Sequence, residues 1–170
     1  MIKLYVDMDG VLANFEKSYR EMWHEYEYDR KRFKAAELEK QIFLDLELMP
    51  GAESLLAHID NAINEHGVHV EILTSTGSSD VTMQEAARSQ KMHWLKEHGI
   101  SFKPNFSNNK KEKANWATAN SILIDDSIGC IEPFNLAGGH GIHHHHETVY
   151  KTAESLYNII NEISNSQKAV

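Results

Sequence analysis

Short apolar runs alternate with longer amphipathic segments along most of the chain. Apolar, β-prone stretches lie at 2–6, 68–73 and 121–124, with shorter candidates near 102–106 and 140–144. Between them, residues at helical spacing predict helices over 12–40, 52–65, 82–98, 130–137 and 147–165, and a short one within 108–119. Strands that alternate with helices predict an α/β fold, in which a mostly parallel sheet lies between two helical layers.

The segment after the first strand is long and rich in aromatic and charged residues. We expect residues 1–14 and 51–170 to form the core domain and residues 15–50 to form a small helical cap, which ends at Pro50-Gly51. Four aromatic residues of this segment share one helical face: Phe15, Tyr19, Trp23 and Tyr26. This stripe either packs the cap onto the body or places Phe15, Tyr19 and Trp23 in a substrate pocket.

Composition narrows the class of protein. The 170 residues include 17 Lys and Arg and 25 Asp and Glu, which gives a net charge of −8 and argues against extended nucleic-acid binding. No apolar run reaches membrane-spanning length, and charge appears too early for a signal peptide, so we expect a cytoplasmic protein that does not bind membranes. The single cysteine, Cys130, fits a reducing compartment and a small buried side chain.

Polar residues follow three of the predicted strands directly. Asp7 and Asp9 follow the first strand, Thr74 and Ser75 the second, and Asp125 and Asp126 the third; a lysine cluster at 110, 111 and 113 precedes the third strand. Parallel strands would bring these ends to one edge, where carboxylates need a cation among them. Oxygen ligands favour Mg²⁺, and hydroxyl and ammonium groups suit a phosphoryl group. Taken alone, Asp-Met-Asp-Gly also fits an ordinary Asx turn.

Together these motifs resemble the haloacid dehalogenase superfamily of phosphohydrolases, with its three-layer Rossmann-like fold. Asp7-Met-Asp9-Gly-Val resembles the first motif, Ile72-Leu-Thr74-Ser75 the second, and Leu123-Ile-Asp125-Asp126 the fourth, so the match spans residues 1–126. The residue sequences of the motifs are most similar to those of the 5′(3′)-deoxyribonucleotidase branch and its bacterial and phage relatives. That branch also carries a small helical cap after the first motif, although Asn14 stands where it often has Asp.

The resemblance implies a role for each matching residue. Asp7 would attack phosphorus and form an aspartyl-phosphate, and Asp9 would act as general acid and then as general base. Mg²⁺ would be held by the Asp7 carboxylate, the Asp9 main-chain carbonyl and either Asp125 or Asp126. Phosphate-binding residues would be Thr74, Ser75 and Lys113. Lys113 is preferred over Lys110 and Lys111 because Lys113-Ala-Asn-Trp-Ala117 resembles the Lys-x-x-x-Ala spacing ahead of the fourth motif.

We therefore expect a Mg²⁺-dependent phosphomonoesterase of the 5′-nucleotidase type, with a small phosphorylated substrate that is a nucleoside or deoxynucleoside monophosphate. The alternatives are another small phosphate metabolite, a nucleic-acid 3′-phosphate end, or a binding protein that has lost activity. Four consecutive histidines, His143–His146, are interpreted as loop or strand-end residues, because neighbouring strand residues point to opposite faces and cannot all meet one ion.

Overall fold

Five parallel strands form one sheet in the order β3-β2-β1-β4-β5. The computed structural model describes residues 1–23 and 29–168. Its strands are β1 (Lys3–Val6), β2 (His69–Ser75), β3 (Lys103–Ser107), β4 (Ser121–Asp125) and β5 (His140–His143). The predicted α/β, Rossmann-like architecture with a parallel sheet is confirmed.

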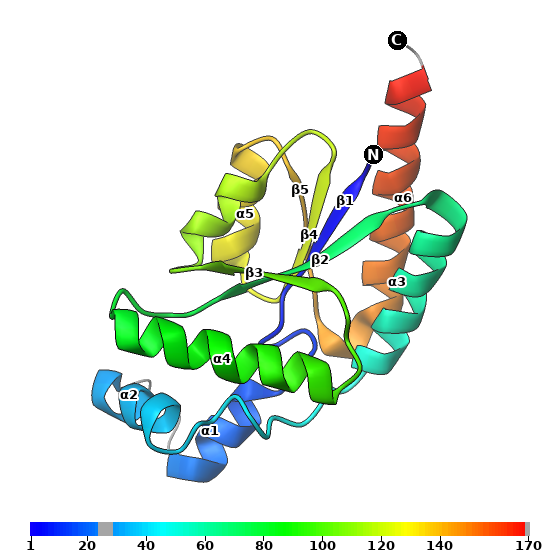
Figure 1. The fold of residues 1–170 in the computed structure, drawn as a ribbon. Helices are drawn as coiled ribbons and strands as arrows, with labels where there is room; N and C mark the ends of the chain where they lie inside the picture. Colours follow the sequence, from blue (N-terminus) through cyan, green and yellow to red (C-terminus); the bar gives the residue numbers. More distant parts are fainter. Residues whose placement is uncertain (24–28, 169–170) are drawn as a thin grey trace.

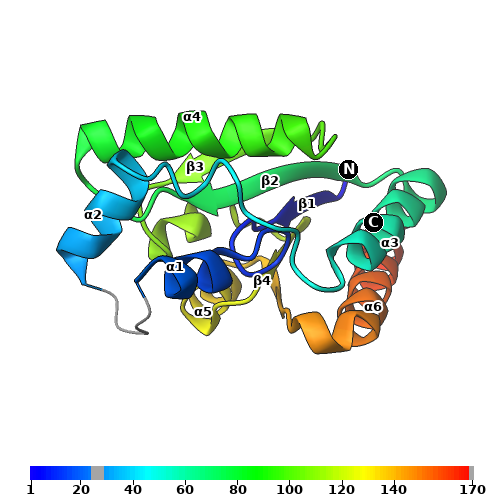
Figure 2. The ribbon, with the colours of Figure 1, turned by 90° about the horizontal axis from the view of Figure 1, so that it is seen from below.

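Helices cover both faces of this sheet (Figures 1 and 2). The α-helices are α1 (Phe15–Trp23), α2 (Arg30–Leu38), α3 (Ala52–His66), α4 (Val81–Glu97), α5 (Ile128–Leu136) and α6 (Val149–Lys168). Two short 3₁₀ helices, η1 (Lys111–Trp116) and η2 (His146–Thr148), precede β4 and α6. Among the described residues, no helix combines the length and apolar character needed to cross a membrane.

The alternation of strand side chains divides the core into two clusters, one on each face of the sheet. On one face, Leu4 and Ile122 pack with apolar residues of α3, α4 and α6. On the other, Tyr5 and Leu123 pack against Cys130, Ile131 and Phe134 of α5. α5 thus covers the second face, and Trp116 of η1 and the adjacent Ala117 also pack against this smaller cluster.

The predicted helical region 12–40 contains two helices, α1 and α2, rather than one continuous run. A new helix starts at Arg30 because the Asp29 side chain caps it, accepting a hydrogen bond from the Lys31 N–H. Tyr26, which we placed on the aromatic face, lies outside the described residues. α2 lies against α4 (Figure 1). The division into a core and a 15–50 cap stays a prediction.

Candidate active site

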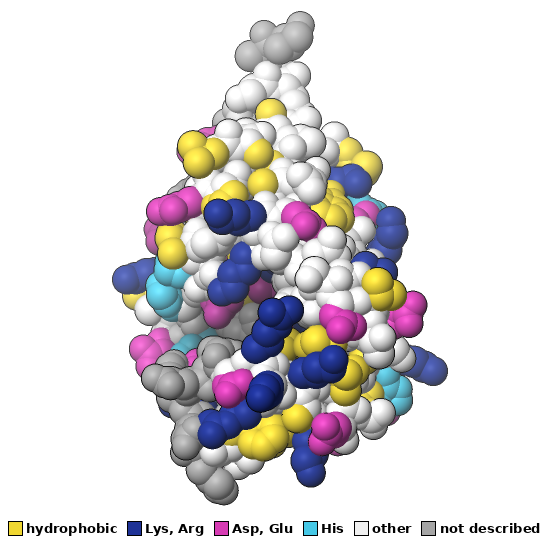
Figure 3. Space-filling view, turned by 90° about the vertical axis from the view of Figure 1, so that its left-hand side faces the viewer, with side chains coloured by type: hydrophobic (Ala, Val, Ile, Leu, Met, Phe, Trp, Pro, Cys, Tyr) yellow, Lys and Arg dark blue, Asp and Glu magenta, His cyan; other side chains and the backbone are white. Residues whose placement is uncertain are grey.

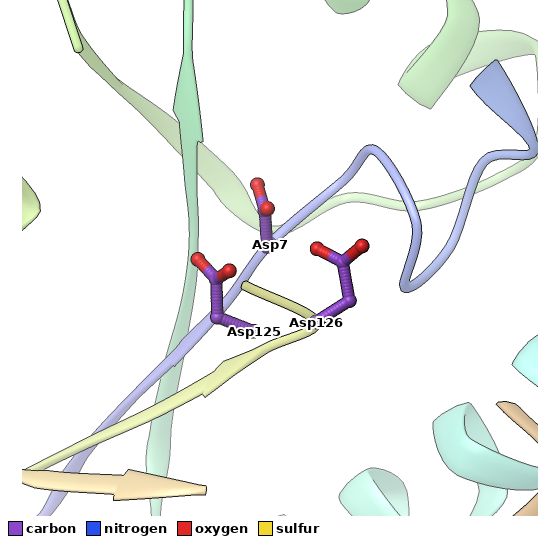
Figure 4. Close-up of side chains that lie close together, drawn as sticks. All are labelled: Asp7, Asp125 and Asp126. Atoms are coloured by element: carbon purple, nitrogen blue, oxygen red, sulfur yellow. The ribbon is translucent and has the colours of Figure 1, made fainter. Parts of the chain in front are cut away.

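Strand register brings the ends of β1 and β4 together. Val6 pairs with Ile124, and the Asp7 N–H continues the ladder by donating to the Ile124 carbonyl at 2.9 Å. Asp7, Asp125 and Asp126 therefore meet at the carboxyl edge of the sheet, where one carboxylate oxygen from each lies within 4.8 Å of the others (Figure 4). The structure thus brings together three of the predicted site residues in an all-oxygen cluster that suits a hard divalent cation.

Lys113 links two of these carboxylates. Its Nζ lies 2.8 Å from Oδ1 of Asp7 and 2.7 Å from Oδ2 of Asp125, and all three side chains are buried. The Met8 N–H also donates to Oδ1 of Asp7, at 2.8 Å. Both contacts fall on Oδ1, and no described residue donates a hydrogen bond to Oδ2 of Asp7. Asp7 is therefore anchored through Oδ1, and its Oδ2 accepts no hydrogen bond from the described residues.

The two aspartates of the fourth motif have different surroundings. The Asp125 side chain is fully buried, and both its oxygens are occupied, Oδ2 by Lys113 and Oδ1 by the Ser127 N–H at 2.9 Å. Asp126 is exposed and lines the cavity described below. Of the two, Asp126 has the freer carboxylate for a metal ion.

Charge at this edge is not balanced by protein groups alone. Desolvation and the nearby Asp7 carboxylate raise the pKa of Asp125 to about 6, although Lys113 opposes the shift. Desolvation, Asp7 and Asp125 raise the pKa of Asp126 to about 7. Carboxylates that repel one another in this way favour a bound cation, which removes the repulsion. The residues present therefore fit a divalent metal.

Gly10 lets the loop after β1 approach this cluster. Its φ is +79°, in the left-handed region that favours glycine. A Cβ at this position would lie only 2.2 Å from Oδ2 of Asp126. The glycine of the first motif is thus required both for the backbone turn and for the position of the Asp126 carboxylate.

Asp9 has a partner that the sequence analysis missed. The fully buried Nζ of Lys91, on α4, lies 2.5 Å from Oδ2 of Asp9 and donates at 2.9 Å to both Thr74 Oγ1 and the Ser75 carbonyl. Desolvation raises the pKa of Asp9, and Lys91 counteracts this shift. A signal was present in the sequence, because Lys91 shares the apolar face of its helix with Met83, Ala87 and Trp94. A lysine at a core position calls for an acidic partner.

The end of β2 places its two predicted phosphate-binding residues differently. The Thr74 hydroxyl is buried against Lys91, and Thr74 does not line the cavity. Ser75 does line it, together with Thr76 and Gly77, and Ser75 Oγ accepts a hydrogen bond from the Gly77 N–H at 3.1 Å. The loop that leaves β2 therefore forms one wall beside the carboxylates.

A cavity of about 620 Å³ opens onto the cluster. On the face in Figure 3, basic side chains gather around a hollow in the surface. Charged side chains line one part of the cavity, namely Asp7, Asp9, Asp126 and Lys113, and aromatic side chains line another, namely Phe15, Phe33 and Phe43. The volume is in the range that holds a small-molecule ligand.

The predicted aromatic contacts are only partly at this cavity. Phe15 lines it and stacks on Phe43, with 5.4 Å between ring centroids. Tyr19 is 2% exposed and stacks behind Phe15 at 5.6 Å, and neither Tyr19 nor Trp23 lines the cavity. Phe33 and Phe43 line it in their place, because α2 and the chain before α3 fold back beside Phe15. The regular spacing along α1 identified a packing face more than a pocket.

The histidine run follows β5 past the site. The His144 N–H donates to the Asp125 carbonyl at 2.9 Å, and the His143 ring Nε2 lies 2.9 Å from the Asp126 carbonyl. His144, His145 and His146 all line the cavity. Burial lowers the pKa of His144 to about 4, so this ring is neutral near pH 7. The histidines thus lie at the strand end and beyond it, as expected.

Cys130 is 1% exposed within the smaller core cluster. Burial raises the pKa of its thiol to about 12, so the thiolate needed for nucleophilic attack is absent near neutral pH. The expectation of a small buried side chain is confirmed.

No protein-family model matches the chain, and no curated protein matches it. Among solved structures it is similar to the D,D-heptose 1,7-bisphosphate phosphatase of Burkholderia thailandensis, at 16% identity and a TM-score of 0.44, over 82% of this chain and 75% of that one. It is also similar to a haloacid dehalogenase-like hydrolase of Burkholderia xenovorans, at 14% identity and a TM-score of 0.47, over 82% of this chain and 79% of that one. A hydrolase of Streptococcus pneumoniae is similar at 14% identity and a TM-score of 0.47, over 84% of this chain and 92% of that one. Similarity at these identities and TM-scores assigns no function to this chain.

Proposed function

We propose that this chain is a Mg²⁺-dependent phosphomonoesterase of the haloacid dehalogenase type that hydrolyses nucleoside monophosphates. One observation carries the proposal. Asp7 is fixed by Lys113 beside Asp125 and Asp126, and Asp9 follows two residues later at the same cavity. A nucleophilic carboxylate, a carboxyl group for proton transfer, a cation and an oxygen-lined metal site are the parts that phosphoryl transfer through a covalent intermediate needs.

In the proposed reaction, Oδ2 of Asp7 attacks phosphorus while the bond from phosphorus to the leaving oxygen breaks. Asp9 gives its proton to that oxygen, so an alcohol leaves. In the second half, Asp9 takes a proton from water, whose oxygen attacks phosphorus and displaces Asp7. The raised pKa of Asp9 suits a carboxyl group that carries a proton in one half and releases it in the other.

Lys113 serves the nucleophile and the phosphoryl group. Burial lowers the pKa of Lys113, but its two carboxylate partners, Asp7 and Asp125, outweigh burial and raise this pKa above its usual value, so the ammonium stays charged. The ammonium offsets negative charge on Asp7 as a phosphate dianion approaches. Ser75 and the neighbouring residues Thr76 and Gly77 would contact phosphate oxygens from the opposite wall, and Thr74 would support that wall through Lys91.

Asp7 and Asp126 would hold Mg²⁺ directly, with the Asp9 main-chain carbonyl as a third ligand. When bound, Mg²⁺ supplies positive charge that offsets repulsion between the nucleophile and the phosphoryl group. Asp125 would act behind them, because its oxygens already accept hydrogen bonds from Lys113 and Ser127.

The nucleoside part of the proposal is supported by the aromatic wall. Phe15, Phe33 and Phe43 offer ring faces and edges to a planar base, and the cavity of about 620 Å³ accommodates a base, a sugar and one phosphate. A longer nucleic acid would bring many phosphates to a chain of net charge −8, which disfavours a nucleic-acid end as substrate.

The test is phosphate release from a panel of nucleoside 5′- and 3′-monophosphates, sugar phosphates and a 3′-phosphorylated oligonucleotide, with Mg²⁺ and with EDTA. We expect Mg²⁺-dependent release that favours mononucleotides. Faster release from sugar phosphates would retain the chemistry and overturn the substrate class, and release from the oligonucleotide would move the substrate to nucleic-acid ends. No release from any member would contradict the enzymatic proposal and favour a binding role.

A further inference from the structure

Lys91 occupies an unusual position for a lysine. Its side chain has 0% exposure, and its ammonium group has three oxygen neighbours: Asp9 Oδ2 at 2.5 Å, Thr74 Oγ1 at 2.9 Å and the Ser75 carbonyl at 2.9 Å. An ammonium has three N–H donors, so each donor has one acceptor. The Nζ also lies 4.5 Å from the centre of the Phe43 ring, which favours the charged form. The surroundings are built to hold this cation.

Stability alone does not account for a buried lysine here. Removing an ammonium from water is costly, and well-packed apolar residues of similar volume often replace buried ion pairs without loss of stability. The neighbours of Lys91 on the same face of α4 are Ala87 and Trp94, both buried and apolar. A methionine would fit that pattern and would satisfy the core. The presence of a lysine here therefore indicates that the Asp9 carboxyl group needs a cationic partner.

Asp9 lies in the loop after β1, outside any strand or helix. Its Oδ2 is held by Lys91, whereas its Oδ1 has no hydrogen-bond partner among the described residues. Lys91 thus fixes the orientation of the carboxyl group and leaves one oxygen, Oδ1, to carry the proton. Through Thr74 and Ser75, the same ammonium fixes this orientation relative to the end of β2, where the phosphate-facing wall begins.

We propose that Lys91 is a positioning residue that holds Asp9 for proton transfer in both halves of the reaction. The inference rests on the function proposed above, in which Asp9 protonates the leaving alcohol and then deprotonates water. Lys91 itself touches neither substrate nor water in this scheme, and it acts only through the geometry of Asp9. Proton transfer by a positioned group contributes about 10²–10⁴-fold to a rate, so its loss is measurable.

The leaving group separates this role from a general structural one. Departure of an alcohol from a nucleoside monophosphate needs Asp9 as acid, whereas 4-nitrophenolate leaves without protonation. Hydrolysis of the Asp7 phosphate ester needs Asp9 as base whichever substrate formed it. Misplacing Asp9 therefore slows both steps for the nucleotide and only the second step for 4-nitrophenyl phosphate.

The experiment compares Lys91→Met with wild type and with Lys96→Met, an exposed lysine on the same helix. With a nucleoside monophosphate we expect kcat of Lys91→Met to fall about 10²-fold or more, with KM within a few-fold. With 4-nitrophenyl phosphate we expect a rapid burst of about one nitrophenolate per enzyme, then slow turnover. Lys96→Met should behave like wild type on both substrates.

A double-mutant cycle with Asp9→Asn tests whether the two residues act as a unit. If Lys91 acts through Asp9, Lys91→Met causes no further loss in the Asp9→Asn background. Equal losses on both substrates without a burst, additive losses in the cycle, or unchanged activity would each overturn the positioning role. A wild-type protein that releases phosphate from neither ester would instead overturn the proposed function itself.

Folding of the variants is monitored by near-UV circular dichroism, because the indole of Trp94 is fully buried one turn from Lys91 and donates to the Leu46 carbonyl at 2.7 Å. Where Lys91→Met loses this signal, Lys91→Gln gives the same comparison, since its amide keeps two N–H donors for Thr74 and Ser75 and removes the charge opposite Asp9.

Discussion

The Nζ of Lys113 lies 2.8 Å from Oδ1 of Asp7, and both side chains are buried at the carboxyl edge of the sheet. The lysine comes from η1 and the aspartate from the end of β1, so the contact joins segments that are distant in sequence. Because the ammonium occupies one oxygen, the nucleophile in the proposed reaction has a fixed orientation before substrate arrives. Such preorganisation is what a covalent mechanism requires of its attacking group.

Asp7→Asn should abolish phosphate release while the protein stays folded. The asparagine side-chain oxygen can still accept from the Met8 N–H, and Lys113 keeps its 2.7 Å contact with Asp125. An amide is a poor nucleophile toward phosphorus, so we expect at least about a 10³-fold loss in kcat. Steady-state phosphate release and circular dichroism check this. Asp60→Asn, an exposed change on α3, is the control, and wild-type turnover in Asp7→Asn would exclude Asp7 as nucleophile.

Mg²⁺ should raise the melting temperature through the carboxylate cluster. A ligand at 100 times its Kd stabilises the folded state by about 2.7 kcal/mol. We expect wild type and Asp60→Asn to respond fully and Asp126→Asn to respond weakly, because it removes one of the three converging carboxylates. Thermal unfolding with Mg²⁺ and with EDTA measures the difference. An undiminished response in Asp126→Asn would move the metal site away from this residue.

Gly10→Ala should disturb the site as well as the backbone. A side chain at a left-handed φ costs about 1–2 kcal/mol, and here the new Cβ would also displace the Asp126 carboxylate, 2.2 Å away. Gly138→Ala is a matched control, since its φ is +89° and a Cβ there would meet no atom within 4 Å. We expect similar losses of unfolding free energy from backbone strain in both, but a loss of the Mg²⁺ response only in Gly10→Ala. Retention of that response would show that Asp126 adjusts freely.

Glu37 should make stability fall as pH rises. Its side chain is fully buried on α2, and burial raises its pKa from 4.5 to about 7. Through Glu37, the folded state therefore binds more protons than the unfolded state between these values, so this residue should account for up to about 3 kcal/mol of the unfolding free energy that is lost across that window. Glu37→Gln should make this slope shallower by the Glu37 share, leaving the contribution of the raised Asp125 and Asp126 carboxyl groups, and Glu39→Gln, exposed at the end of the same helix, should keep the full slope.

Urea unfolding at pH 5 and pH 8 measures the effect of Glu37. The decisive comparison is the difference between the two pH values within each variant, because other groups titrate alike in all of them. A slope in Glu37→Gln as steep as in wild type would assign the pH dependence to another group.

The extent to which the sequence predicted the site follows from how each residue reaches it. Asp7 and Asp126 follow buried strands directly and Asp125 ends one, and parallel strands carry the residues at their carboxyl ends to one edge, so the meeting of these three was predictable. The end of α3 was predictable for a different reason, because Gly67 follows its last apolar turn and caps it with φ +63°.

Residues that reach the site from helices and connecting segments, and not from strand ends, were harder to predict. Lys91 lies 82 residues from Asp9 and approaches it from a helix, and its meaning depends on which side of α4 is buried. Phe33 and Phe43 line the cavity because α2 and the chain before α3 lie beside Phe15, and hydrophobic periodicity does not predict such a contact between segments. Helical spacing located the aromatic face of α1, but of the described aromatic residues on that face, Phe15 lines the cavity and Tyr19 and Trp23 do not.

The cavity draws its walls from different stretches of chain. The groups proposed to react come from the loops after β1 and β4 and from η1, whereas the aromatic wall comes from residues 15–43, between β1 and α3. In evolutionary terms, this arrangement separates the residues proposed for the chemistry from the residues proposed to select the substrate. Lengthening or replacing the segment between β1 and α3 would change the molecules admitted, and the strand register that aligns the carboxylates would pass unchanged to the descendant.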